Sequence, residues 1–149
     1  SAFWEENKLD ETLAVFNADL QEEETSLEDA SRKIRQKILD APLPEKLEQS
    51  ILGAAAEIVE QQTDAAPCFA VRSSALGEDD VASFAGQYHS CLSIPLEDLP
   101  GAYKKVVASL YTPEAMEYRL HKDFKPGEIM MAVACQLMIP ARASGVLYS

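Results

Sequence analysis

The stretch Val71–Gln87, VRSSALGEDDVASFAGQ, decides how the rest of the chain is interpreted. Arg72 and two serines end a short apolar run, and Ser83–Gln87 then carries a hydroxyl, an alanine and a glycine. A guanidinium offers a rigid set of donors that fits phosphate oxygens, and small residues suit a lid that closes over a ligand. The stretch indicates a strand end that binds an anion, followed by a loop. The ordinary alternative is a strand end whose arginine pairs with Glu78 or Asp79.

Strand signals surround this stretch in the second half of the chain. Short apolar or alternating runs bounded by proline and polar residues are typical of strands. On that basis, strands are predicted at Cys68–Val71, Tyr88–Ile94, Ile129–Met138 and Gly145–Tyr148. The last of these runs is cut by the chain end, so we expect the chain to be an excised part of a longer protein.

Two helices are predicted between these strands. Leu99, Tyr103, Val106 and Leu110 recur at spacings of four, three and four, which is typical of a helix with one apolar face. Thr112 then suits the cap of a second helix, because Pro113 fits the first turn that follows it.

The first half of the chain is predicted to be helical. One helix is expected over residues 2–16, where Phe3, Trp4 and Phe16 are packing candidates, and Gln21–Thr25 is a polar link. A second helix is predicted to start at Ser26, since Ser26 and Asp29 resemble a capping box. Its apolar stripe is Leu27, Ala30, Ile34 and Ile38, and Pro42 ends it.

A third helix is predicted to begin at Pro44, which suits a first helical turn, and to run to about Gln62. Its inward residues are expected to be Leu47, Ile51, Ala54, Ala55, Ile58 and Val59. The helical first half and the strand-rich second half together predict an α/β fold of the α+β kind, with a helical subregion over 1–66 and a mixed or antiparallel strand-rich part over 67–149.

Charge is distributed unevenly between these two parts. Residues 1–66 hold 16 acidic and 6 basic residues and so carry −10 of the net charge of −12. An acidic, solvated helical surface explains this, and the deficit of basic residues argues against a nucleic-acid partner. No run is long and apolar enough for a membrane helix, so no membrane partner is expected.

The cysteines and histidines indicate no metal site. Cys68, Cys91 and Cys135 are far apart and form no CxxC pair, which argues against a zinc site and favours reduced thiols in the cytoplasm. His89 and His121 are interpreted as surface or packing residues. No metal-ligating residue is assigned.

Four motifs in order carry a resemblance to a known family. After VRSSALGEDDVASFAGQ come ASLYTPEAMEYR at 108–119, MAVACQLM at 131–138 and SGV at 144–146. This set resembles the ATP-grasp domain of the phosphoenolpyruvate synthase and pyruvate phosphate dikinase family. AFWEENKLDETL and KILDAPLPEKLEQSIL likewise resemble the helical region that precedes the VRSSA strand in the synthases. The resemblance covers essentially the whole chain and implies that 1–149 is part of one N-terminal ATP-grasp nucleotide-binding domain.

The resemblance implies roles for single residues. Arg72 matches the family arginine that contacts the ATP phosphates and is the one catalytic candidate. The segment from Ser83 to Ser90 matches a mobile loop that covers the phosphates, which makes Ser83, Gly86, Gln87 and Ser90 ATP-binding candidates. Ser90 keeps a hydroxyl where the family usually has threonine, the loop is one residue shorter, and Ser93 replaces a usual asparagine.

The same resemblance gives the adenine end of the site. Gln136 is the candidate for polar contact with adenine, and Met138 is the candidate for apolar contact with the ring. Arg119 matches a family arginine that we interpret as structural. The family's glycine-rich lysine segment is expected upstream of this chain, and its further nucleotide ligands downstream.

The activity that the resemblance implies belongs to a longer parent enzyme. Such a synthase uses ATP and Mg²⁺ to phosphorylate a carrier histidine and then pyruvate, and yields phosphoenolpyruvate, AMP and phosphate. The parent is thus expected to be a cytoplasmic dikinase, with a homo-oligomer possible and this chain alone inactive. Two alternatives remain open. One is an ATP-grasp phosphotransferase with another acceptor, such as a pyruvate phosphate dikinase or a glucan or antibiotic dikinase, and the other is a non-catalytic regulatory module.

Overall fold

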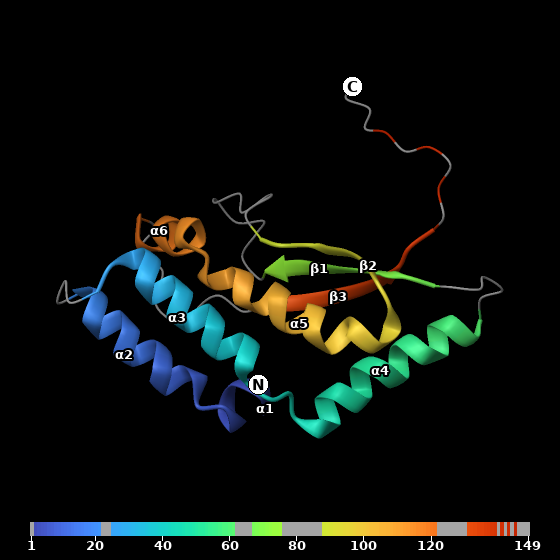
Figure 1. Ribbon diagram of the computed structural model, residues 1–149, viewed down its shortest axis with the longest axis horizontal. Helices are drawn as coiled ribbons and strands as arrows, with labels where there is room; N and C mark the ends of the chain where they lie inside the picture. The colour runs from blue at the N-terminus through green and yellow to red at the C-terminus, as the bar shows by residue number, and fades with distance from the viewer. Residues whose placement is uncertain are drawn as a thin grey trace.

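The computed structural model describes residues 2–21, 25–61, 67–75, 88–121 and 131–139, together with Ala141, Ala143 and Gly145. Its helices are α1 (Ala2–Glu6), α2 (Leu9–Gln21), α3 (Leu27–Asp40), α4 (Glu45–Glu60), α5 (Leu99–Ala108) and α6 (Pro113–His121), and its strands are β1 (Phe69–Ala75), β2 (Cys91–Ile94) and β3 (Met131–Leu137). Two single 3₁₀ turns, η1 (Leu96–Asp98) and η2 (Ser109–Tyr111), flank α5. This mixture confirms the predicted α+β class (Figure 1).

The three strands form one antiparallel sheet in the order β2-β1-β3. β1 pairs with β3 over its full length, from Phe69 opposite Leu137 to Ala75 opposite Met131. The prediction that the strand ends at Val71 is therefore wrong, because β3 supplies backbone partners for four further residues. β2 is shorter than predicted. Tyr88 precedes the strand and packs with the buried Leu110 and Ala115 instead.

Helices cover one face of this sheet. Phe69 and Val71 are fully buried there, and they belong to a cluster with Leu99 and Val106 of α5 and Ala55 of α4. Figure 1 shows α3, α4 and α5 on the same side of the strands. The sheet is thus packed on one face by apolar side chains, as antiparallel sheets commonly are.

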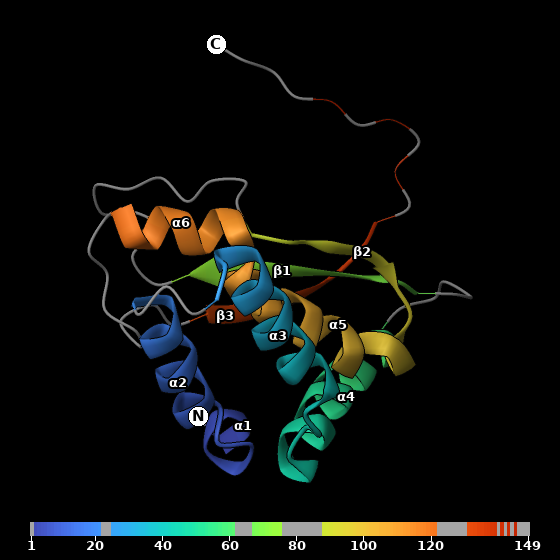
Figure 2. The same ribbon diagram turned by 60° about the vertical axis from the view of Figure 1, so that its left-hand side comes forward.

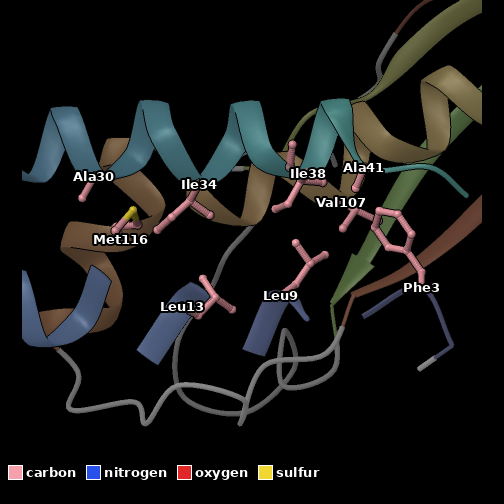
Figure 3. Close-up of a cluster of buried hydrophobic side chains, with 10 residues drawn as sticks. Phe3, Leu9, Leu13, Ala30, Ile34, Ile38, Ala41, Val107 and Met116 are labelled. Carbon is pink, nitrogen blue, oxygen red and sulfur yellow. The ribbon is translucent and has the colours of Figure 1, made fainter. Parts of the chain in front are cut away.

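A second cluster joins the helices to one another. Phe3 of α1 and Leu9 and Leu13 of α2 pack against α3 and against Val107 of α5 and Met116 of α6 (Figure 3). Figure 2 shows α1 and α2 beside α3, on the side of α3 away from β2. Phe3 is 1% exposed, and Trp4 and Phe16 pack at the margin, which confirms the predicted packing role of these three rings.

The first predicted helix is divided in two, which corrects the single helix expected over 2–16. Lys8 has a φ of 50°, a left-handed conformation that interrupts a helix. The Asn7 side chain next to it donates to the carbonyls of Phe3 at 2.9 Å and Pro42 at 3.0 Å. The bond to Pro42 fastens the break to the α3–α4 link. α2 also continues past residue 16 to Gln21.

The signals at helix starts are confirmed, with small corrections. Ser26 Oγ accepts from the backbone N–H of Asp29 at 3.1 Å and caps α3, which ends two residues before Pro42. Pro44 is the residue before α4 and not inside its first turn. Thr112 Oγ1 accepts from Ala115 N at 3.3 Å and caps α6.

The inward face of α4 is narrower than predicted. Ala55 is buried, and Leu47, Ile51 and Val59 are half-buried, but Ala54 and Ile58 are exposed. The helix packs on α5 and the sheet along one side only, so the two outer residues of the expected stripe face solvent. Of the strand predicted at Gly145–Tyr148, only Gly145 is described, and it is not in a strand.

Candidate functional site

Arg72 lies in the middle of β1, on the face of the sheet that the helices do not cover. Side chains alternate along a strand, and here Phe69 and Val71 are buried whereas Arg72 and Ser74 are exposed. The expectation that Arg72 follows the strand is corrected by the seven-residue pairing with β3. Its backbone is consequently held by a paired strand, and we name this uncovered surface the open face.

β3 contributes small residues and one amide to the open face. Its burial alternates along its length, with Ala132, Ala134 and Gln136 exposed between half-buried neighbours. Arg72 is opposite Ala134, and Gln136 is opposite Ala70. Gln136 is therefore the diagonal neighbour of Arg72, which is within reach of long side chains. The small Ala134 leaves room above the sheet beside the guanidinium.

Met138 lies at one end of the open face. Its backbone N–H donates to the Cys68 carbonyl at 2.8 Å, which continues the β1–β3 ladder by one residue. Its sulfur accepts a hydrogen bond at 3.2 Å from the backbone N–H of Ser93. Ser93 belongs to β2, the strand on the other side of β1. Since β1 lies between β2 and β3, the Met138 side chain crosses β1.

The predicted loop candidates are only partly placed. Ser90 is exposed and directly precedes Cys91, which pairs with Val71. Continuing that register puts Ser90 opposite Arg72. Ser83, Gly86 and Gln87 lie outside the described residues, as do Glu78 and Asp79, the alternative partners of Arg72. The structure thus brings Arg72, Ser90, Gln136 and Met138 to one sheet and leaves three candidates unplaced.

The described part of the chain offers Arg72 no carboxylate partner. Another exposed arginine, Arg32 on α3, does have a carboxylate partner, since it pairs with Asp29. An exposed cation with small neighbours on a rigid strand is suited to an anionic ligand. Within the same residues, no group of three or more histidine, cysteine or acidic side chains could hold a metal ion.

Two of the three thiols lie on the packed side of the sheet. Cys91 is buried and Cys135 half-buried, both in the cluster beneath the sheet. Burial raises the pKa of the Cys135 thiol, which favours the protonated, unreactive form. Burial likewise raises the pKa of Tyr103, which packs edge-on against Phe3 among the helices. His89 is exposed, and the His121 side chain is not described.

Two features of the open face were missed from the sequence. The alternation of MAVACQLM, small residues between larger ones, could have indicated that Ala132 and Ala134 lie on the uncovered face of the sheet. From the sequence, Ser93 is only the replacement of a usual family asparagine, and its contact with Met138 could not be predicted because it joins residues 45 positions apart. Leu92, 61% exposed, and Ile139, 83% exposed, add apolar surface nearby in the sequence.

The fold and the site together define a class of protein. It is an α+β protein whose uncovered sheet face carries an arginine among small residues. The chain belongs to the family described as pyruvate phosphate dikinase, AMP/ATP-binding domain, which matches residues 1–149. This confirms the resemblance seen in the four motifs.

Curated relatives agree with this assignment. The chain is 38% identical to a phosphoenolpyruvate synthase of Neisseria meningitidis over 99% of this chain and 19% of that protein. It is 36% identical to a phosphoenolpyruvate synthase of Escherichia coli, over 84% of this chain and 16% of the relative. It is 32% identical to a rifampicin phosphotransferase of Bacillus subtilis, over 86% of this chain and 14% of the relative. The chain spans 14 to 19% of the length of these three relatives.

Across the residues that the structure describes, no helix combines the length and the apolar character needed to cross a bilayer.

Proposed function

We propose that residues 1–149 are part of one ATP-grasp domain, in a phosphoenolpyruvate synthase that phosphorylates a carrier histidine and then pyruvate. The products would be phosphoenolpyruvate, AMP and phosphate. The observation that carries the proposal is the position of Arg72, exposed in mid-strand with Gln136 diagonal to it, in a chain matched throughout by an AMP/ATP-binding family. The names of the relatives supply the product, phosphoenolpyruvate, and the carrier histidine, AMP and phosphate rest on the family resemblance. The cytoplasmic location and a homo-oligomer stay predictions.

The proposed ATP site follows the open face. Arg72 would hold and polarise phosphate oxygens, since a fixed guanidinium stabilises charge that develops there. Ser90 would add a hydroxyl beside it, Gln136 would contact the polar edge of adenine, and Met138 its ring. Ser83, Gly86 and Gln87 are proposed to cover the phosphates on the family resemblance alone.

Mg²⁺ is proposed as the cation that accompanies ATP. It prefers carboxylate and phosphate oxygens in an octahedral shell, and it would neutralise phosphate charge during transfer. No cluster of metal ligands exists in the described ranges, so these residues would not hold the ion without the phosphates. The contribution of this chain is therefore the binding and orientation of the triphosphate through Arg72.

Replacement of Arg72 tests this assignment in the full-length parent enzyme. We expect Arg72→Ala to lower pyruvate-dependent AMP formation by about a hundred-fold, because one fixed donor to developing charge is lost. Arg72→Lys should recover only part of the rate, since an ammonium cannot replace the planar fork. ATP isotope exchange, measured alongside, reports the first phosphoryl transfer by itself.

Arg32→Ala is the matched control. Arg32 is also an exposed arginine, but it lies on α3 and pairs with Asp29, and exposed pairs contribute little. Near-normal turnover of Arg72→Ala would contradict the role of Arg72. Failure of the parent to bind ATP would instead favour a non-catalytic module.

An antibiotic is a second candidate for the phosphoryl acceptor of the parent enzyme. The likeness to a rifampicin phosphotransferase favours it. The open face would serve ATP in either enzyme, so the acceptor must be tested directly. Incubation of the parent with ATP and either pyruvate or rifampicin, followed by AMP measurement, distinguishes the two. Pyruvate-dependent AMP alone supports the synthase, and rifampicin-dependent AMP supports the alternative.

A further inference from the structure

Ser93 lies in a β-bulge next to the proposed ATP site. β2 and β1 pair at Cys91 with Val71 and at Ile94 with Phe69, so Leu92 and Ser93 together oppose the single residue Ala70. Ser93 has a φ of 57°, a conformation that serine seldom adopts. Bulges redirect groups next to functional sites, and strained residues are concentrated at ligand-binding positions.

The bulge gives the Ser93 backbone N–H a partner two strands away. It donates to the Met138 sulfur at 3.2 Å, and Ser93 Oγ lies 4.0 Å from the same atom. Methionine is unbranched and has several rotatable bonds, so its side chain would otherwise have many rotamers on an open surface. The contact selects a rotamer that crosses β1.

The Met138 side chain therefore has one orientation and forms an apolar surface at one end of the open face. It is half-buried, although the next residue, Ile139, is 83% exposed. Gln136, which carries an amide, lies on the same face two residues earlier and is exposed. A planar ring placed on the sulfur would meet that amide at its edge, and thioether–aromatic contacts are favourable.

We propose that Ser93 is a positioning residue that holds Met138 across β1 as the platform for the adenine ring. This inference rests on the proposed function, because it assigns one part of the same ATP site. Ser93 itself does not touch the nucleotide. Its effect passes through the sulfur.

The test uses the full-length parent enzyme and a double-mutant cycle. Met138→Leu keeps a similar volume but removes the acceptor, and Ser93→Val disfavours the left-handed conformation because its side chain is β-branched. Each is expected to raise KM for ATP about three-fold with kcat near the parent value, the effect of one weak contact. The double variant should be no worse than either single one, since both remove the same contact.

Two matched variants serve as controls. Ser93→Gly keeps the N–H and adopts the same φ without strain, and Ile139→Leu changes the exposed neighbour of Met138. Ile139→Leu should leave KM for ATP unchanged, and Ser93→Gly, which loses only the Oγ contact at 4.0 Å, should raise it less than Ser93→Val does. In ¹³C-methyl spectra of methionine-labelled enzyme, the Met138 signal should shift in Ser93→Val and stay in place in Ser93→Gly, which a general loss of stability would not reproduce.

The results that overturn the inference are distinct from those that overturn the ATP site. If Arg72→Ala weakens ATP use but Met138→Leu leaves KM for ATP unchanged, the platform is wrong while the site stands. Two other results also contradict the role of Ser93. One is that the increases in KM for ATP add in the double variant, and the other is that the Met138 methyl signal does not shift in Ser93→Val. If Ser93→Val does not fold, Met138→Leu alone decides the role of the sulfur.

Discussion

At the scale of residues, side-chain type indicates chemistry, but neighbours decide whether that chemistry is used. Arg72 and Lys104 are both cations in the second half of the chain. Arg72 is exposed on the open face, whereas the half-buried Lys104 ammonium donates to the carbonyls of Leu39 at 2.5 Å and Ala41 at 3.1 Å, at the end of α3. The first is available to a ligand, and the second binds α5 to α3.

Lys104→Met tests this structural cation. The variant keeps most of the apolar stem but loses two hydrogen bonds and a positive charge at a helix C-terminus, where cations are favourable. We expect a loss of about 1–2 kcal/mol in the free energy of unfolding, measured with urea on the chain. Lys105→Met, at the exposed neighbouring lysine, should change it little, and equal effects of the two variants would refute the role of Lys104.

At the scale of elements, local signals determine helix starts more reliably than helix interiors. The caps at Ser26 and Thr112 depend on residues three positions apart and agree with the prediction. The break at Lys8 does not depend on local residues alone, because Asn7 donates to Pro42, which is 35 positions away. The single helix expected over 2–16 was wrong for that reason.

Ser26→Ala tests the cap of α3. Loss of the acceptor for the Asp29 N–H should lower the free energy of unfolding by about 1 kcal/mol, as measured by urea unfolding. Ser50→Ala is the control, since Ser50 donates from inside α4 to the Lys46 carbonyl and such bonds do not stabilise helices. An unchanged stability in Ser26→Ala would show that packing of the α3 stripe alone determines where the helix begins.

At the scale of the whole molecule, one side of the sheet is packed and the other presents the proposed site. α4 and α5 bury Phe69 and Val71 from below, which holds β1 in place while its alternate residues stay exposed. The described site residues all come from this one surface. The described residues would therefore contact a nucleotide from one side only, and Ser83, Gly86 and Gln87, which are proposed to cover the phosphates, lie outside them.

This one-sided arrangement predicts weak ATP binding by the 149-residue chain itself. A ligand bound from one side buries less surface than one enclosed in a cleft, and little remains after the entropic cost of association. Titration calorimetry with Mg-ATP should show much weaker binding than the full-length parent gives. Micromolar affinity of the chain alone would contradict this prediction.

The sequence by itself determined the α+β class, the caps of α3 and α6 and the family, because these depend on short-range spacing and on ordered motifs. It also indicated the residue types of the site. Only the tertiary structure decided that Arg72 lies in mid-strand, that Ala134 faces it and that Met138 reaches Ser93. Those facts follow from the register of β1 with β3 and from the bulge in β2, since strand pairing joins residues that are far apart in the chain and determines the face on which each side chain lies.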